Sequence, residues 1–152
     1  MPRFIKALLA TLVIATSCKD DKNKITVVDD ETFIADEENE KLKLVIKKAQ
    51  NSLDHFINEF NLHANDTVYW FSAKTRFEHT NGINHIWLKI VDYRKDGVFI
   101  GILHNEVDWS DSFKIGDTIS VNRKKIEDWY IENENTKKVQ GDFTERILFE
   151  NN

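Results

Sequence analysis

The chain has 152 residues, of which 41% are hydrophobic and 11% aromatic, and its formal net charge is -5. This length favours one domain, and the apolar content can build a core, which excludes an intrinsically disordered chain. The negative charge and the lack of a long basic run argue against nucleic-acid binding, because such a field repels phosphates.

The first 17 residues have the pattern of a targeting segment. Arg3 and Lys6 open it, and residues 7–16 form an apolar or small run that ends just before Cys18, the only cysteine. A membrane-spanning helix needs about 20 apolar residues, so this run predicts a cleaved signal peptide over 1–17. The sequence ATSC at 15–18 matches a bacterial lipoprotein box, in which the cysteine receives fatty acyl chains such as palmitate. The alternative is a stray thiol behind an ordinary signal peptide.

Residues 18–35 are polar and acidic, and they predict a tether between the lipid on Cys18 and the domain. The Lys-Asp-Asp sequence after Cys18 resembles a signal that sends some Gram-negative lipoproteins to the outer face of the outer membrane. We therefore expect a lipid-anchored protein of the bacterial cell envelope, at the outer membrane and exposed on the cell surface. Membrane contact is expected through the lipid alone, because an acidic protein surface is repelled by anionic lipid.

The segment 36–62 predicts one long amphipathic helix, because its apolar residues recur at spacings of three and four. Asp36 can cap its start, and the sequence HAND at 63–66 ends it. We expect the apolar stripe to face the core of the domain. The stripe consists of Leu42, Ile46, Ala49, Leu53, Phe56 and Phe60.

From residue 66 onward the hydrophobic period changes to two, which predicts strands. Asp96-Gly97 is the strongest hairpin signal. The pattern indicates an α+β fold, in which the long helix packs on a curled, largely antiparallel sheet of about five or six strands. One domain is expected over 36–150, and its last segment, 144–150, is compatible with a strand or a short helix. The expected strands are 67–77, 83–93, 98–106, 116–121, 126–131 and 138–149.

No catalytic, metal-binding or cofactor motif is found. The histidines at 55, 63, 79, 85 and 104 show no metal-ligand spacing, so neither a metal site nor a cofactor is predicted. No motif supplies an activated nucleophile, so catalytic residues stay unassigned. The basic group at 123–125 is interpreted as a solvated turn between two strands.

Five segments, taken in order, resemble a known family. They are FSAKTRF at 71–77, NHIWLKI at 84–90, GILHNE at 101–106, GDTISVNRKKIEDWY at 116–130 and GDFTERIL at 141–148. Over about 35–149 the chain resembles the YegJ-like family, the domain of unknown function numbered 2314. The resemblance implies a small single domain without an established activity. The chain departs from the family at Asn84, where a glutamate is usual.

Polar positions that match the family form a candidate polar cluster, and two tryptophans are candidate aromatic contacts. These side chains either converge in a pocket, or they include an Asp128–Arg146 ion pair that fixes the last hairpin; we favour the second. The polar cluster consists of Lys74, His85, Asn105, Asp128, Thr144 and Arg146, and the aromatic contacts are Trp87 and Trp129.

The leading hypothesis is a membrane-anchored bacterial lipoprotein whose small domain binds a protein or peptide partner without catalysis. Edge strands and exposed tryptophans are the features that such a domain can use for contact. One alternative is an immunity-type protein that neutralises a toxin at the envelope. The other is an envelope enzyme with His85, Asp128 and Arg146 in one cleft.

Overall fold

The computed structural model describes residues 39–79, 82–104, 107 and 113–149, and the backbone of two short strands nearer the N-terminus. These strands, β1 (Ile25–Val27) and β2 (Phe33–Ala35), pair with each other in antiparallel fashion. The predicted lipidation site Cys18, most of the predicted tether and the candidate residue Asn105 lie outside the described residues.

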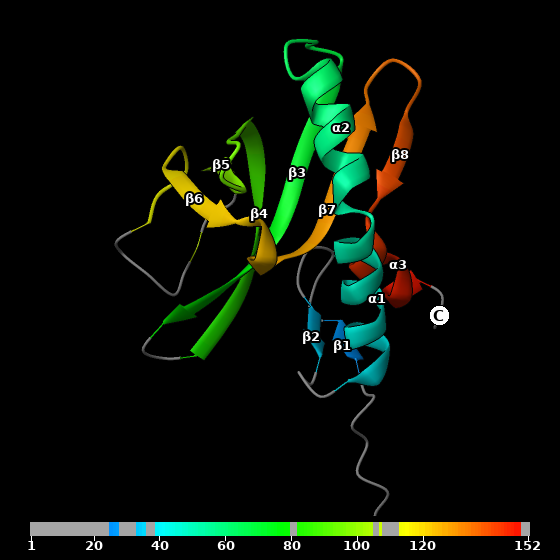
Figure 1. The fold of residues 1–152 in the computed structure, drawn as a ribbon. Helices are drawn as coiled ribbons and strands as arrows, with labels where there is room; N and C mark the ends of the chain where they lie inside the picture. The colour runs from blue at the N-terminus through cyan, green and yellow to red at the C-terminus, as the bar shows by residue number, and fades with distance from the viewer. Residues whose placement is uncertain are drawn as a thin grey trace, which may run out of the picture.

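The centre of the fold is an open sheet of six antiparallel strands in the order β6-β5-β4-β3-β7-β8 (Figure 1). The sheet and its helices confirm the predicted α+β class. The two ends of the sheet are formed by short strands, and its middle by long ones. The strands are β3 (Tyr69–His79), β4 (Gly82–Tyr93), β5 (Val98–Leu103), β6 (Thr118–Asn122), β7 (Ile126–Asn133) and β8 (Lys138–Gly141).

The single long helix expected over 36–62 is not confirmed, because Ser52 separates α1 (Glu40–Asn51) from α2 (Leu53–His63). In an unbroken helix the carbonyl of Ala49 would accept from the N–H of Leu53. Instead it accepts from the Ser52 N–H at 3.2 Å, the Ser52 hydroxyl at 3.0 Å and the Trp129 indole N–H at 3.0 Å. Side chains inserted into the helical ladder break it. The start of α1 is capped by Asn39, whose Oδ1 accepts from the N–H groups of Lys41 and Leu42.

The hydrophobic core lies between the sheet and the two helices α1 and α2, which run across β7 in Figure 1. The apolar stripe predicted from the sequence supplies Ala49, Leu53, Phe56 and Phe60, all buried. Phe56 and Phe60 meet Phe71 of β3 edge-on, with ring centroids 5.7 and 5.2 Å apart. Burial of these rings, and their edge-to-face geometry, hold the helices on this face of the sheet.

The turns follow the sequence signals, and the structure decides between strand and helix for the C-terminal segment. Gly97 joins β4 to β5 with a φ of 85°, which confirms the hairpin predicted at Asp96-Gly97. The short 3-10 helix η1 (Arg123–Lys125) links β6 to β7. The last segment forms a helix, α3 (Phe143–Phe149), so the helical alternative holds there.

Candidate functional site

Three neighbouring strands bring Trp87, Lys74 and Asp128 into one row across the sheet. Lys74 of β3 lies opposite Trp87 of β4 on one side and opposite Asp128 of β7 on the other. The row is on the face turned away from α1 and α2, because the next residues along the strands belong to the core. Lys74 is 6% exposed and Asp128 is fully buried, so both charges are withdrawn from water.

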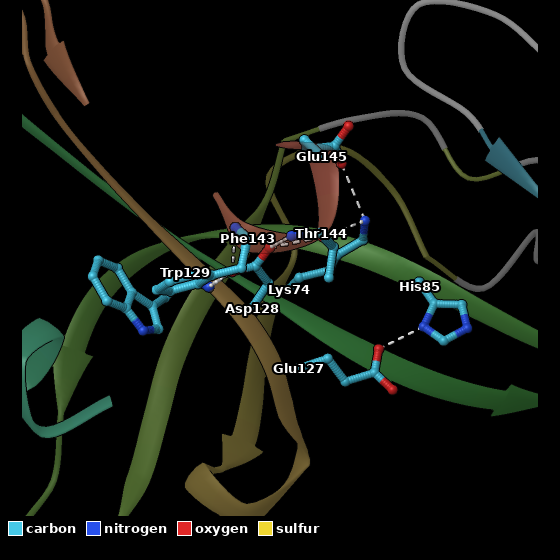
Figure 2. Close-up of polar contacts among 8 residues, drawn as sticks. All are labelled: Lys74, His85, Glu127, Asp128, Trp129, Phe143, Thr144 and Glu145. Atoms are coloured by element: carbon cyan, nitrogen blue, oxygen red, sulfur yellow. Dashed lines mark hydrogen bonds and ion pairs between the residues drawn. The ribbon is translucent and has the colours of Figure 1, made fainter. Parts of the chain in front are cut away.

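A β-bulge at Glu127 sets the direction of Asp128. Lys74 pairs with Asp128, but the next residue of β3, Thr75, pairs with Ile126. Glu127 is therefore the extra residue, and Ile126 and Asp128 point to opposite faces although they are two residues apart. Ile126 fills the core, whereas Asp128 points to the far face, toward the start of α3 (Figure 2).

The carboxylate of Asp128 accepts four hydrogen bonds from its own chain. Oδ2 accepts from the Thr144 N–H and the Thr144 hydroxyl, each at 2.7 Å. Oδ1 accepts from the N–H groups of Trp129 at 2.7 Å and Phe143 at 3.2 Å. The N–H groups of Phe143 and Thr144 open α3 and have no partner inside that helix, so Asp128 caps α3 from a neighbouring strand.

Lys74 joins the same helix from β3. Its Nζ donates to the Thr144 hydroxyl at 3.3 Å and lies 3.1 Å from the Glu145 carboxylate (Figure 2). The same ammonium stands 5.4 Å from the ring centre of Trp87, within the range of a cation–π interaction. The Thr144 hydroxyl therefore accepts a hydrogen bond from Lys74 and donates one to Asp128, which fixes the orientation of all three side chains.

The approach of α3 to the sheet depends on two residues with left-handed backbone. Gly141 has a φ of 80° and Asp142 a φ of 60°. A Cβ on Gly141 would lie 2.1 Å from the carbonyl oxygen of Trp129, a distance at which only glycine fits. The N–H of Asp142 donates to that same oxygen, so the chain turns tightly against β7 before α3 begins.

Negative charge gathers at the start of α3. Burial raises the pKa of the Asp142 carboxyl, and the nearby Glu145 and Asp128 raise it further, while Arg146 and Lys74 act in the opposite direction. Lys74 is the cation that lies inside this group, since Arg146 is exposed. The arrangement is that of a buried ion network, which positions a helix.

His85 and Arg146, which the enzyme alternative placed in one cleft with Asp128, do not bond to Asp128. His85 Nδ1 lies 2.5 Å from Oε2 of Glu127, the bulge residue, and its side chain is 36% exposed. Arg146 forms no ion pair with Asp128 in the part of the chain that the structure describes. The N–H groups at the start of α3 bind Asp128 in place of the expected Arg146 side chain. Trp129 faces the opposite side of the sheet and packs in the core.

Two participants, Glu127 and Glu145, were not among the residues singled out from the sequence. A signal for the bulge exists: Ile126, Trp129 and Ile131 are spaced by three and two within one strand, whereas a regular strand keeps a spacing of two. Glu145 has no comparable signal, since its role depends on where α3 docks.

Within the described residues, no group of three or more histidine, cysteine or acidic side chains is arranged to hold a metal ion. No helix among them has both the length and the apolar character to cross a membrane.

Comparison with known protein families gives a match. The sequence profile of the family DUF2314, described as an uncharacterized protein conserved in bacteria, matches residues 39–151, which is more than half of the chain. The resemblance to the domain of unknown function 2314 is thereby confirmed. No curated protein matches the chain, and no solved structure matches it.

Proposed function

This chain belongs to that bacterial family, and we propose that it is a membrane-anchored lipoprotein whose domain binds a protein or peptide partner without catalysis. The observation that carries the proposal is the state of Asp128. Its carboxylate is fully buried and accepts four hydrogen bonds that hold α3 on the sheet. A general base must reach a substrate proton, so a group engaged in this way favours a structural role over a catalytic one.

The anchor in this proposal rests on the sequence of the first 18 residues. A short apolar run, small residues and then Cys18 form the lipoprotein box, and acyl chains on Cys18 give stable membrane attachment. The acidic segment that follows would hold the domain away from the lipid surface. The Lys-Asp-Asp sequence at 19–21 supports a place at the outer membrane, facing outward.

The anchor is tested by comparing the chain with its Cys18→Ser variant in bacterial cells grown with a labelled fatty acid. We expect label on the unchanged chain, which should stay in the membrane fraction, and no label on the variant, which should become soluble. Ser17→Ala is the matched control, because it changes the neighbouring residue but leaves the cysteine, and it should keep the label. Membrane retention of the Cys18→Ser variant would contradict the proposed anchor.

The binding role is tested with the Cys18→Ser chain as bait for proteins of the bacterial envelope, with heat-unfolded bait as the control. Each captured protein is then purified and titrated by calorimetry. We expect a saturable complex with at least one of them. Turnover of an envelope substrate that disappears in Asp128→Asn, in a variant shown to be folded, would favour the enzyme alternative instead.

A further inference from the structure

The strand β6 forms one end of the sheet, and among the described residues it pairs with β5 alone. The N–H of Leu103 donates to the carbonyl of Asp117, and the N–H of Arg123 donates to the carbonyl of Gly97. Backbone groups alternate along an antiparallel strand. Residues 119 and 121 therefore face β5, and the N–H and C=O groups of Thr118, Ser120 and Asn122 point outward along the free edge.

This edge lacks the features that usually protect a sheet against further pairing. Such features are charged side chains, proline and bulges. The strand reads Thr-Ile-Ser-Val-Asn, with no charge and no proline, and its pairing with β5 runs in unbroken register. The side chains of Thr118, Ser120 and Asn122 are exposed, whereas Ile119 and Val121 are buried in the core.

The opposite end of the sheet differs. There β8 has four residues, begins with Lys138 and ends at Gly141, where α3 turns across the end of the strand. Its short length, its lysine and the helix are protective. Among the residues that the structure describes, β6 is therefore the end of the sheet that is open to another strand.

Basic residues collect at the Asn122 end of this edge. The 3-10 helix η1 follows β6 directly, and Gly97 of the β4–β5 turn lies against Arg123, since a Cβ on Gly97 would be 3.5 Å from Arg123 Cδ. Asp54 pairs with Arg123 at 2.6 Å, and Asp96 is the other acid in the group. The basic residues of the group are Arg94, Lys95, Arg123, Lys124 and Lys125. Five basic residues against two acidic ones leave an excess of positive charge, although the whole chain is negative.

We propose that the free edge of β6 docks an extended acidic peptide segment of a partner protein, which adds a seventh strand to the sheet. The outward backbone groups supply the hydrogen bonds of strand addition, and the basic group selects for acidic residues at one end of the segment. The inference rests on the proposed binding function and names its surface and the chemistry of its partner.

Charge also separates this occupant from a second copy of the chain. In an antiparallel pairing of two β6 edges, the Asn122 end of one copy lies beside the Thr118 end of the other. Lys124 and Lys125 of one copy would then approach both Asp117 and Lys114 of the other, so attraction and repulsion offset each other and a second copy gains no net charge attraction. An acidic segment gains attraction at the Asn122 end, where the basic residues are in excess. In antiparallel addition the acidic residues are expected at the N-terminal end of the peptide strand, because that end lies beside Asn122.

The test selects binders from a display library of random linear peptides on the Cys18→Ser chain and measures the affinity of synthetic copies. Selected peptides should carry acidic residues near one end. Ser120→Pro should lower the affinity of the selected peptides by about tenfold or more, because proline removes an outward N–H without removing a hydrogen bond to β5. The matched variant Ser120→Ala keeps the N–H and should bind like the unchanged chain.

A second pair of variants checks the charge and does not touch the strand. Lys124→Glu with Lys125→Glu should weaken acidic peptides several-fold, with a loss that shrinks in high salt. The same charge change on α1, Lys43→Glu with Lys47→Glu, should have little effect.

Peptides that are neutral or basic, or that bind Ser120→Pro and the unchanged chain equally well, would overturn the edge proposal while leaving a binding function in place. Failure to select any peptide would overturn it too, and capture of a folded envelope protein would then still uphold the proposed function. If the unchanged chain binds no peptide but forms a dimer, the edge of β6 would be assigned to a second copy instead.

Discussion

Replacing Asp128 by alanine should cost a large part of the stability of the domain. The change removes the acceptor of four hydrogen bonds, from the N–H groups of Trp129, Phe143 and Thr144 and from the Thr144 hydroxyl. A buried donor left without a partner costs about 1–3 kcal/mol. Some of these donors can regain water if α3 moves away, so we expect a total loss of about 3–5 kcal/mol, the range found for breaking buried charged contacts. Folded domains are stable by about 5–15 kcal/mol.

Urea unfolding at neutral pH, followed by circular dichroism, measures this loss as a lower midpoint at nearly constant slope. Asp128→Asn keeps one acceptor oxygen and should lose about 1–3 kcal/mol. Glu127→Ala is the matched control, because its partner His85 is 36% exposed and such a contact is worth about 1 kcal/mol or less. If the free energy of unfolding of Asp128→Ala lies within about 1 kcal/mol of that of the unchanged chain, the carboxylate does not hold α3 in place and is free for a catalytic role.

Three further predictions concern the same region. Gly141→Ala should lower the free energy of unfolding in urea by about 3 kcal/mol or more, because its Cβ would meet the Trp129 carbonyl at 2.1 Å. Gly116→Ala is the control: no atom lies within 4 Å of its Cβ, so it should lose only the roughly 1–2 kcal/mol of a left-handed backbone. Equal losses in the two variants would contradict this. Asp142→Asn should raise the free energy of unfolding at pH 7. The pKa of this carboxyl is higher in the folded chain than its usual 3.8, so ionisation of Asp142 at pH 7 destabilises the folded chain. The gain should disappear when urea unfolding is repeated below about pH 3.8, where the carboxyl is protonated in both states, and a gain that stays constant with pH would contradict the raised pKa. Trp129→Phe should cost about 1–2 kcal/mol, because the indole N–H no longer bonds to Ala49, and an unchanged urea midpoint would show that this contact does not stabilise the break between α1 and α2.

The sequence predicts the sheet well because hydrophobic alternation is a local property. The period of two after residue 66, the Asp96-Gly97 turn and the turn at 123–125 all appear in the structure at their expected places. The break at Ser52 was not predictable in the same way. It depends on the indole of Trp129, which is far away in the chain and competes for the Ala49 carbonyl.

The candidate polar cluster was partly recognisable from residue types. Lys74, Asp128 and Thr144 do meet, in one hydrogen-bonded group at the start of α3. Their arrangement depends on the bulge at Glu127 and on the left-handed turn at Gly141, both of which are set by packing between strands. Arg146 was the expected partner of Asp128 because opposite charges attract, but the start of a helix is an equally good partner for a carboxylate.

The basic group at 123–125 shows a related limit. As a sequence it is a short turn with three cations. In the fold this group lies at the end of the unprotected edge of β6, near Arg94 and Lys95 of the β4–β5 turn. The strand edge beside it is what a second protein could bind.

The intact mass of the protein purified from bacterial membranes tests whether a lipid on Cys18 anchors it. Attachment through the lipoprotein box predicts a chain that begins at Cys18 and carries the added mass of its acyl chains. A chain that begins at another residue, or a Cys18 without acyl mass, would contradict the proposal that a lipid holds this binding domain at the membrane.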